Sequence, residues 1–229
     1  MAASSGPDVI DTGLVLALDA ADRNSYPGSG TTWTDLSGQG NNMTMGGTLA
    51  YSDGVFTSTA TTANYFIRNP FSHPTTAVTV EMWCLANSGS SGDAFWSYAI
   101  SSTDNHNLLI DQSNLTLYGP IGTPTGIPTN INVADGTWKQ LVRTSNRSNG
   151  AEVLYVNGVV SFTTTISSGT NFTSGGSLVL GQEQDSSGGS FDATQALQGK
   201  YAVFRIYNRA LTASEVRQNF NATRSRFGI

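Results

Sequence analysis

Short runs of alternating apolar and polar residues recur along this chain, and such runs are typical of strands with one buried face. Segments rich in Gly, Ser, Thr and Asn separate these runs and favour turns. One turn contains Asn157-Gly158, the strongest short-range signal for a two-residue hairpin. The pattern predicts strands over Leu14–Asp19, Val78–Ala86, Trp138–Thr144, Ala151–Val156, Val159–Thr163, Leu178–Leu180 and Tyr201–Tyr207.

The predicted strand 78–86 divides clearly into two faces. Its even-numbered residues from Val78 to Cys84 share one face, whereas Glu81 and Trp83 point to the other. We therefore expect Cys84 to be a small core residue. It is the single cysteine of the chain, which excludes an intrachain disulfide. The sequence places no histidine beside it, so we do not expect a nucleophilic thiol.

A short helix is predicted close to the C-terminal end. Thr212 and Glu215 have the spacing of a capping box, in which each side chain accepts a hydrogen bond from the other residue's backbone. Leu211 precedes the cap and can pack against Val216 as a hydrophobic staple. These signals predict a helix that runs to about Asn221.

Length and composition favour a single all-β domain. The chain has 229 residues, of which 38 % are hydrophobic and only 12 % charged, as expected for a sandwich with wet outer faces. We predict one antiparallel jelly-roll sandwich over residues 1–229, with one short C-terminal helix. The net charge of −5 argues against nucleic acid as a partner.

No segment of the sequence has the pattern of a membrane anchor or a secretion signal. No run approaches the roughly 20 apolar residues of a membrane helix. The first eleven residues lack a basic segment followed by an apolar one, so we expect no signal peptide. Membrane insertion is not expected either.

A polar stretch, 181–199, lies between two apolar runs and is predicted to be a long loop. Crowded oxygens on such a loop repel one another or stay unsatisfied unless water or a cation lies among them. A hard cation such as Ca²⁺ takes roughly 6–8 oxygen ligands, whereas zinc prefers His and Cys, which the loop lacks. Composition alone also leaves open a solvated surface loop. The oxygen-bearing residues are Glu183, Gln184, Asp185, Asp192 and Gln195.

A second segment, 97–106, reads SYAISSTDNH and carries Asp104 and Asn105. Together the two segments resemble the pentraxins, the calcium-dependent ligand-binding members of the laminin-G-like and concanavalin-like sandwiches. In that family an Asp-Asn pair follows a Ser-Tyr-Ala strand, and a Gly-Gln-Glu-Gln-Asp-Ser loop supplies the remaining calcium ligands. Here the corresponding loop begins GQEQDSSGG.

The resemblance implies two bound calcium ions. It implies that the first ion is held by Asp104, Asn105, Glu183, Asp185 and the main-chain carbonyl of Gln184. It implies that the second is held by Glu183, Asp185, Asp192 and Gln195.

The resemblance also implies a ligand that completes the calcium coordination, such as a sugar hydroxyl or a phosphate oxygen. His106 follows the Asp-Asn pair and is a candidate for the ligand-facing surface. Ile110 stands where the family's choline pocket has an aromatic residue, and no matching glutamate is found. Phosphocholine specificity is therefore not expected. The other histidine, His73, precedes Pro74 and is expected to be structural or exposed.

The segment 25–38 reads SYPGSGTTWTDLSG and follows a Leu-Asp-Ala strand. It resembles the opening of laminin-G-like modules in bacteriophage structural proteins. We expect Trp33 and Leu36 to pack under this loop, while Pro27 and the glycines shape its turns. The resemblance implies a component of a phage-like virion surface, in contact with other virion proteins or with further copies of the chain.

The sequence leaves three classes of function to compare. We predict a non-enzymatic, lectin-like protein that binds a glycan or a phosphate-bearing polymer through calcium, for attachment to a host surface. The alternative is a structural virion decoration protein whose calcium only stiffens loops. An enzyme is not expected, because retaining glucanases need two carboxylates about 5–5.5 Å apart, and Glu81 has no carboxylate two or four residues further on.

Charge is distributed unevenly. Residues 200–229 carry a local net charge of +5, because Glu215 is their only acidic residue. The positive charges of this segment could bind an acidic neighbouring protein, or they could simply keep the exposed side of the helix in contact with water. Both interpretations remain open.

Overall fold

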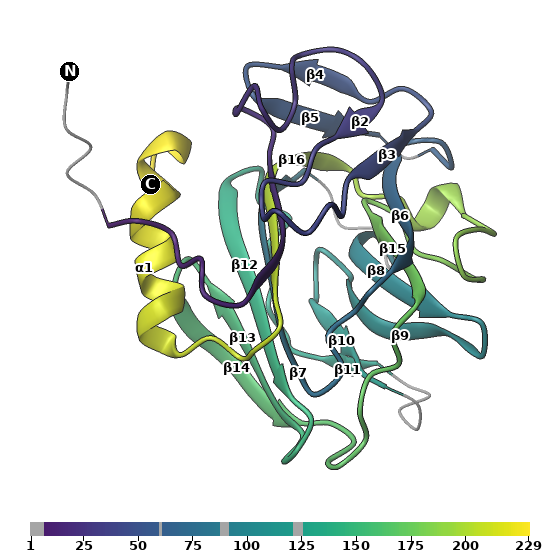
Figure 1. The fold of residues 1–229 in the computed structure, drawn as a ribbon, viewed down its shortest axis with the longest axis vertical. Coiled ribbons are helices and arrows are strands. Elements are labelled where there is room, and N and C mark those ends of the chain that lie inside the picture. Colours follow the sequence, from purple (N-terminus) through teal and green to yellow (C-terminus); the bar gives the residue numbers. More distant parts are fainter. Residues whose placement is uncertain (1–6, 60, 88–91, 121–125) are drawn as a thin grey trace.

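The computed structural model describes residues 7–59, 61–87, 92–120 and 126–229. Within these ranges the chain forms two sheets of eight strands each, and all strand pairs in them are antiparallel. The sheets stack face to face, and a C-terminal helix covers the outer face of one of them (Figure 1). The predicted all-β sandwich with a short C-terminal helix is confirmed.

The first sheet has the strand order β14-β13-β12-β7-β16-β5-β4, and β1 also pairs with β16. Its strands are β1 (Leu14–Asp19), β4 (Ala50–Ser52), β5 (Val55–Ser58), β7 (Ala77–Ala86), β12 (Trp138–Asn146), β13 (Ala151–Val156), β14 (Val159–Thr165) and β16 (Gly199–Tyr207). The hairpin between β13 and β14 turns at Asn157 and Gly158, whose φ angles of 53° and 72° are those of a primed turn. The predicted hairpin is confirmed.

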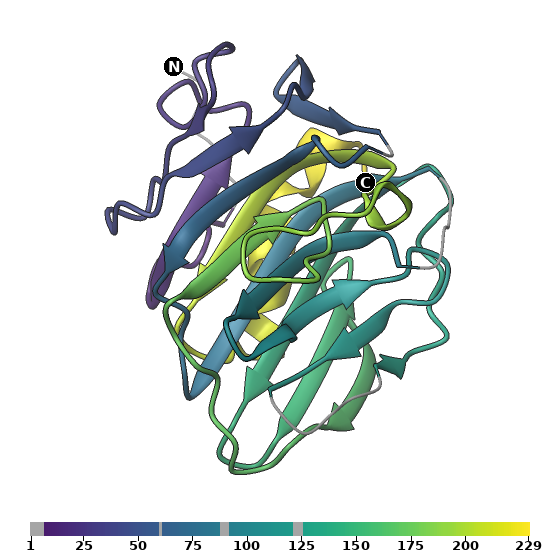
Figure 2. The same cartoon turned by 90° about the vertical axis from the view of Figure 1, so that its right-hand side faces the viewer.

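The second sheet has the strand order β11-β10-β9-β8-β15-β6-β3-β2. Its strands are β2 (Thr32–Trp33), β3 (Met43–Gly46), β6 (Tyr65–Phe71), β8 (Ala94–Ile100), β9 (Thr103–Ile110), β10 (Thr116–Tyr118), β11 (Ile127–Pro128) and β15 (Gly176–Leu180). The segment between β15 and β16 crosses the outer face of this sheet, on the side of the sandwich away from the helix (Figure 2).

The two faces of β7 are buried in different surroundings. Met82 and Cys84 lie in the main core between the sheets, and burial raises the pKa of the Cys84 thiol well above its usual value. Trp83 lies on the opposite face and stacks on Phe227, with 4.2 Å between ring centroids. The predicted alternation is confirmed, and the thiol is a core group.

The described ranges also contain three short helical segments: η1 (Ala193–Gln195), α1 (Ala213–Thr223) and η2 (Arg224–Phe227). The predicted capping box of α1 is present, since Thr212 accepts a hydrogen bond from the Glu215 backbone and Glu215 accepts one from the Thr212 backbone. Leu211 and Val216 are buried in the same apolar cluster. No helix in the described residues is long and apolar enough to cross a membrane.

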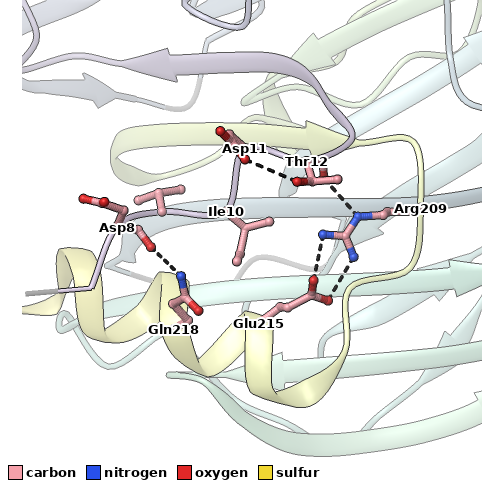
Figure 3. Close-up of a pocket in the computed structure, with 8 residues that line it drawn as sticks. Asp8, Ile10, Asp11, Thr12, Arg209, Glu215 and Gln218 are labelled. Carbon is pink, nitrogen blue, oxygen red and sulfur yellow. Dashed lines mark hydrogen bonds and ion pairs between the residues drawn. The ribbon is translucent and has the colours of Figure 1, made fainter.

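The N-terminal segment 8–12 is tied along α1. The Arg209 guanidinium donates two hydrogen bonds to the Glu215 carboxylate, at 2.9 and 2.8 Å, and one to the Thr12 carbonyl, at 2.9 Å (Figure 3). Gln218 donates to the Asp8 carbonyl at 2.8 Å. Arg209 lines a hollow between this segment and the helix. Its guanidinium is already paired with Glu215 and is therefore not free to bind an anion there.

The packing of the segment 25–38 was predicted only in part. Trp33 is fully buried and meets Phe56 edge to face, with centroids 4.8 Å apart. Leu36, however, is 41 % exposed, so its predicted packing under the loop is wrong. Asp35 points inward instead and accepts a hydrogen bond from the Ala17 backbone, which turns the next side chain outward.

Carboxylates elsewhere in the chain neutralise part of the charge of the basic C-terminal segment 200–229. Glu81 is fully buried beneath α1 and accepts hydrogen bonds from Arg205 at 3.0 Å, Gln140 at 2.9 Å and Asn219 at 2.8 Å. Three arginines of the segment 200–229 form ion pairs, namely Arg205 with Glu81, Arg209 with Glu215 and Arg226 with Asp19. The local charge of this segment therefore overstates the free positive charge on the surface.

We expect Glu81→Ala to lower the free energy of unfolding by about 3–5 kcal/mol, because it leaves the Arg205 charge buried without a carboxylate. Chemical denaturation measures this change. The matched control is Lys139→Met, which removes a more exposed ion pair with Asp135 and should cost at most about 1 kcal/mol. Equal losses in the two variants would contradict the structural role of Glu81.

Candidate functional site

The segment 181–198 is anchored to the second sheet by a buried amide. Gln184 is fully buried, and its amide nitrogen donates to the carbonyls of Ser97 and Ser177, both at 3.1 Å. Its side-chain oxygen accepts from the Gly188 backbone at 2.7 Å. The Ser97 hydroxyl also donates to the Gln182 carbonyl at 2.7 Å. These bonds fix the first half of the loop over β8 and β15.

Glu183 is a buried carboxylate with an unused oxygen. The residue is only 3 % exposed, and its Oε2 atom has no hydrogen-bond partner. Burial, and then the charges of Asp185 and Asp104, raise its pKa to about 7. The structure thus brings carboxylates from the loop and from the start of β9 into one electrostatic neighbourhood.

Asp104 and Asp185 line the same hollow, which has a volume of about 330 Å³. Asp104 also accepts a hydrogen bond from the Asn105 backbone, at 2.8 Å. The two predicted segments therefore meet. Within the described residues, however, no three His, Cys, Asp or Glu side chains already stand close enough together to hold a metal ion.

The residues predicted for a second calcium lie further along the loop. Asp192 is exposed and caps η1, where it accepts hydrogen bonds from the Thr194 backbone and hydroxyl at 2.8 and 2.9 Å. These bonds hold the pKa of Asp192 below its usual value. Gln195 is half-buried, next to Gly92. Asp192 is not among the charges that raise the Glu183 pKa, which are those of Asp185 and Asp104.

His106 is a structural residue. It is fully buried, and its Nε2 atom accepts a hydrogen bond from the Thr173 backbone at 2.7 Å. Burial lowers its pKa to about 4, which keeps the ring neutral. The expectation that His106 lines an open ligand face is therefore wrong. His73 is also buried, as a structural histidine, and bonds to Pro74 and Asn107.

Ile110 offers little surface to a ligand. It is 7 % exposed and packs with Ala94, Leu108 and Tyr118. Its position at the end of β9 is as far from Asp104 as that strand allows.

Two residues of this region were missed by sequence reasoning. The Tyr118 pKa is raised by burial and, more weakly, by the charges of Asp111 and Glu183. Asp111 has a positive φ of 64° and accepts a hydrogen bond from the Gly92 backbone. An acidic residue directly after a predicted strand was the available signal for Asp111; nothing in the sequence pointed to Tyr118.

A family model described as the concanavalin A-like lectin/glucanases superfamily matches residues 58–217. C-reactive protein 1.1 of Limulus polyphemus is 32 % identical over 146 residues, which are 61 % of this chain and 60 % of that protein. Human neuronal pentraxin-1 is 36 % identical over 147 residues, covering 61 % of this chain and 32 % of that protein. The match thus spans less than two thirds of either relative.

Solved structures support the same architecture. A heptameric SAP-like pentraxin from Limulus polyphemus matches with a TM-score of 0.58 and 24 % identity over 67 % of this chain and 73 % of that one. The binding domain of botulinum neurotoxin DC, solved in complex with SialylT, matches with a TM-score of 0.67 and 15 % identity over 93 % of this chain and 52 % of that one. At these identities the likeness shows the fold alone.

The raised Glu183 pKa predicts a pH dependence of the metal-free protein. The pKa of Glu183 in the folded protein, about 7, lies above its ordinary value of 4.5, so stability should fall as the pH rises from about 4.5 to about 7, by up to about 3 kcal/mol. Glu183→Gln should remove this loss, because an amide does not ionise.

Chemical denaturation in chelator at pH 5 and at pH 8 measures it. Asp192→Asn, at an exposed carboxylate, should retain the pH dependence of the unmodified protein. The same pH dependence in Glu183→Gln would contradict the assignment.

Proposed function

Because the chain belongs to the concanavalin A-like lectin and glucanase superfamily, we propose that it is a calcium-dependent, lectin-like module that binds a glycan or a phosphate-bearing polymer. One observation carries this proposal. The Oε2 atom of Glu183 is buried without a partner, beside two further carboxylates whose charges act on it. A buried charge without a partner is costly, and a cation placed there would remove that cost.

The donors around Glu183 fit calcium. They are oxygens on a loop that the Gln184 amide holds in place, and calcium prefers oxygen ligands in flexible numbers. Zinc fits poorly, because no His or Cys is among the described residues that line the hollow holding Asp104 and Asp185. The proposed ligands of the first ion are Asp104, Asn105, Glu183, Asp185 and the carbonyl of Gln184.

A second calcium requires the end of the loop to close on its beginning. Asp192 and Gln195 would join Glu183 and Asp185 in holding it. Asp192 is already exposed, so its carboxylate is accessible to an ion once its bonds to Thr194 are released. Calcium with an open coordination position accepts a sugar hydroxyl or a phosphate oxygen directly.

The ligand class is supported by the relatives. The binding domain of botulinum neurotoxin DC, of which this chain matches 52 %, was solved in complex with SialylT, and we take this as support for a glycan ligand. Glucanases share the superfamily name. We nevertheless propose a binding protein without catalysis, since Glu81 is locked beneath α1 by Arg205 and Asn219.

We further propose that the module is displayed on a phage-like virion surface for host attachment. The segment 25–38, with its resemblance to phage structural modules, supports this setting. A purely structural decoration protein is the alternative. It is favoured by Arg217 and Arg224, which lie over the Phe220 ring at 5.4 and 5.8 Å and form no ion pair within the described residues. Two such cations could dock on an acidic neighbour.

Calcium should stabilise the folded protein. An ion that binds only the folded state at a hundredfold excess over its Kd adds about 2.7 kcal/mol, so the melting temperature should rise. Isothermal titration and thermal denaturation measure the effect. Asp185→Ala should abolish it, while Asp11→Asn, at an exposed carboxylate of the N-terminal segment, should leave it unchanged. No heat and no shift in the unmodified protein would refute the site.

A glycan array separates ligand binding from a purely structural role. If calcium presents the ligand, hits should appear in calcium and disappear in chelator, and Asp185→Ala should lose the same hits. An array without chelator-sensitive hits would favour the decoration protein, provided that calcium still raises the melting temperature.

A further inference from the structure

A groove adjoins the carboxylates at the start of β9. The hollow of about 330 Å³ that holds Asp104 and Asp185 continues into a second one of about 220 Å³. The two share Ile100, Ser101, Ser102 and Ser187 among their lining residues. We call this continuous depression the hydroxyl groove. Its far end lies at residues 173–176, where β15 begins.

Hydroxyl side chains dominate the lining of the hydroxyl groove. Those of Ser101, Ser102 and Ser174 are exposed. None of these three takes part in a side-chain hydrogen bond within the described part of the chain, so each can both donate and accept one. Ile100, itself 7 % exposed, supplies the apolar part of the floor.

The hydroxyl groove carries no positive charge. No Lys, Arg or His is among the described residues that line either hollow, whereas Asp104 and Asp185 line one of them. Away from the carboxylate end, where the proposed calcium would lie, a chain of phosphate or sulfate groups laid along the groove would find no cation to pair with. A neutral polyol meets no such penalty, and its hydroxyls match those of the groove.

The floor of the hydroxyl groove is held in shape. The Tyr98 hydroxyl donates to the Thr173 carbonyl and accepts from the Gly176 backbone, both at 2.8 Å. Ser187 donates to the Ala99 carbonyl at 3.3 Å. A surface fixed before binding loses less freedom when a ligand settles on it.

We infer that the hydroxyl groove is a subsite for the inner sugars of a neutral oligosaccharide. The terminal sugar of that oligosaccharide lies at the carboxylates Asp104, Glu183 and Asp185. The inference rests on the proposed function and narrows it, because it selects a neutral glycan over a phosphate-bearing polymer. The groove lies at the Thr103 end of β9, and Ile110 lies about 20 Å further along that strand. The subsite is therefore separate from the apolar cluster around Ile110.

The test uses linear oligomers of glucose, mannose, galactose and N-acetylglucosamine, one to six units long, and, from two units upward, forms with and without a phosphate on the inner sugars. Binding is measured on an array and then by calorimetry, in excess calcium. Affinity for at least one neutral series should rise about tenfold, or about 1.4 kcal/mol, between one and three units. The phosphorylated form of that series should bind no more tightly than the neutral one.

Ser174→Leu removes a hydroxyl and fills the far end of the hydroxyl groove without touching the carboxylates. This substitution should remove most of the rise in affinity between one and three sugar units, while leaving the affinity for calcium unchanged. Ser102→Leu, in the shared part, should act in the same direction. Ser29→Leu, at an exposed serine of the N-terminal loop, should behave as the unmodified protein.

The outcomes separate this inference from the proposed function. An absence of calcium binding overturns both. If calcium binds but the affinity for the oligosaccharide does not rise with the number of sugar units, the subsite alone is overturned. The same holds if Ser174→Leu and Ser29→Leu show the same rise in affinity with oligosaccharide length. Tighter binding of the phosphorylated series overturns the preference for a neutral glycan.

Discussion

The buried amide of Gln184 is the interaction on which the proposed site depends. It is bonded on one side to the carbonyls of Ser97 and Ser177 and on the other to the backbone of Gly188. The residues directly before and after it are the carboxylates Glu183 and Asp185. A long polar loop would otherwise sample many conformations. This anchor holds both carboxylates over the sheet, within electrostatic reach of the start of β9.

The two outer faces of the sandwich differ in whether their buried carboxylates have hydrogen-bond partners. On the helix side, the buried carboxylate of Glu81 is bonded to Arg205, Gln140 and Asn219. On the loop side, Glu183 keeps a buried oxygen without a partner. Structural carboxylates are satisfied within a protein, whereas carboxylates left in mutual repulsion are characteristic of sites that receive something from outside. This contrast is the physical basis for assigning function to the loop face.

The hydroxyl groove extends the same contrast. Charge is concentrated at the carboxylate end, and the remainder is lined by neutral hydroxyls and a buried isoleucine. In the proposed complex, an ion would bind one sugar at the carboxylate end, and neutral hydrogen-bonding groups would contact its neighbours along the rest of the groove. The ion would supply most of the affinity for one sugar, and the groove would decide which neighbours of that sugar are tolerated.

The sequence by itself determined the elements and their faces. Period-two alternation is a local property of a strand half in contact with a core, so β7 and its buried Cys84 were predictable. The Asn157-Gly158 turn and the capping box of α1 are equally local, because they need only neighbouring backbone groups. The loop carboxylates were also found from sequence, since their crowding is visible along the chain.

Only the tertiary structure decided what lies beside those elements. His106 follows directly after the predicted ligand pair, yet a backbone donor at Thr173, distant in sequence, holds it in the interior. Leu36 is exposed because Asp35 takes the inward position to bond Ala17. The hydroxyl groove is formed by three segments that share no local pattern. Burial and hydrogen bonding between distant segments depend on how the sheets stack, and no local periodicity encodes that.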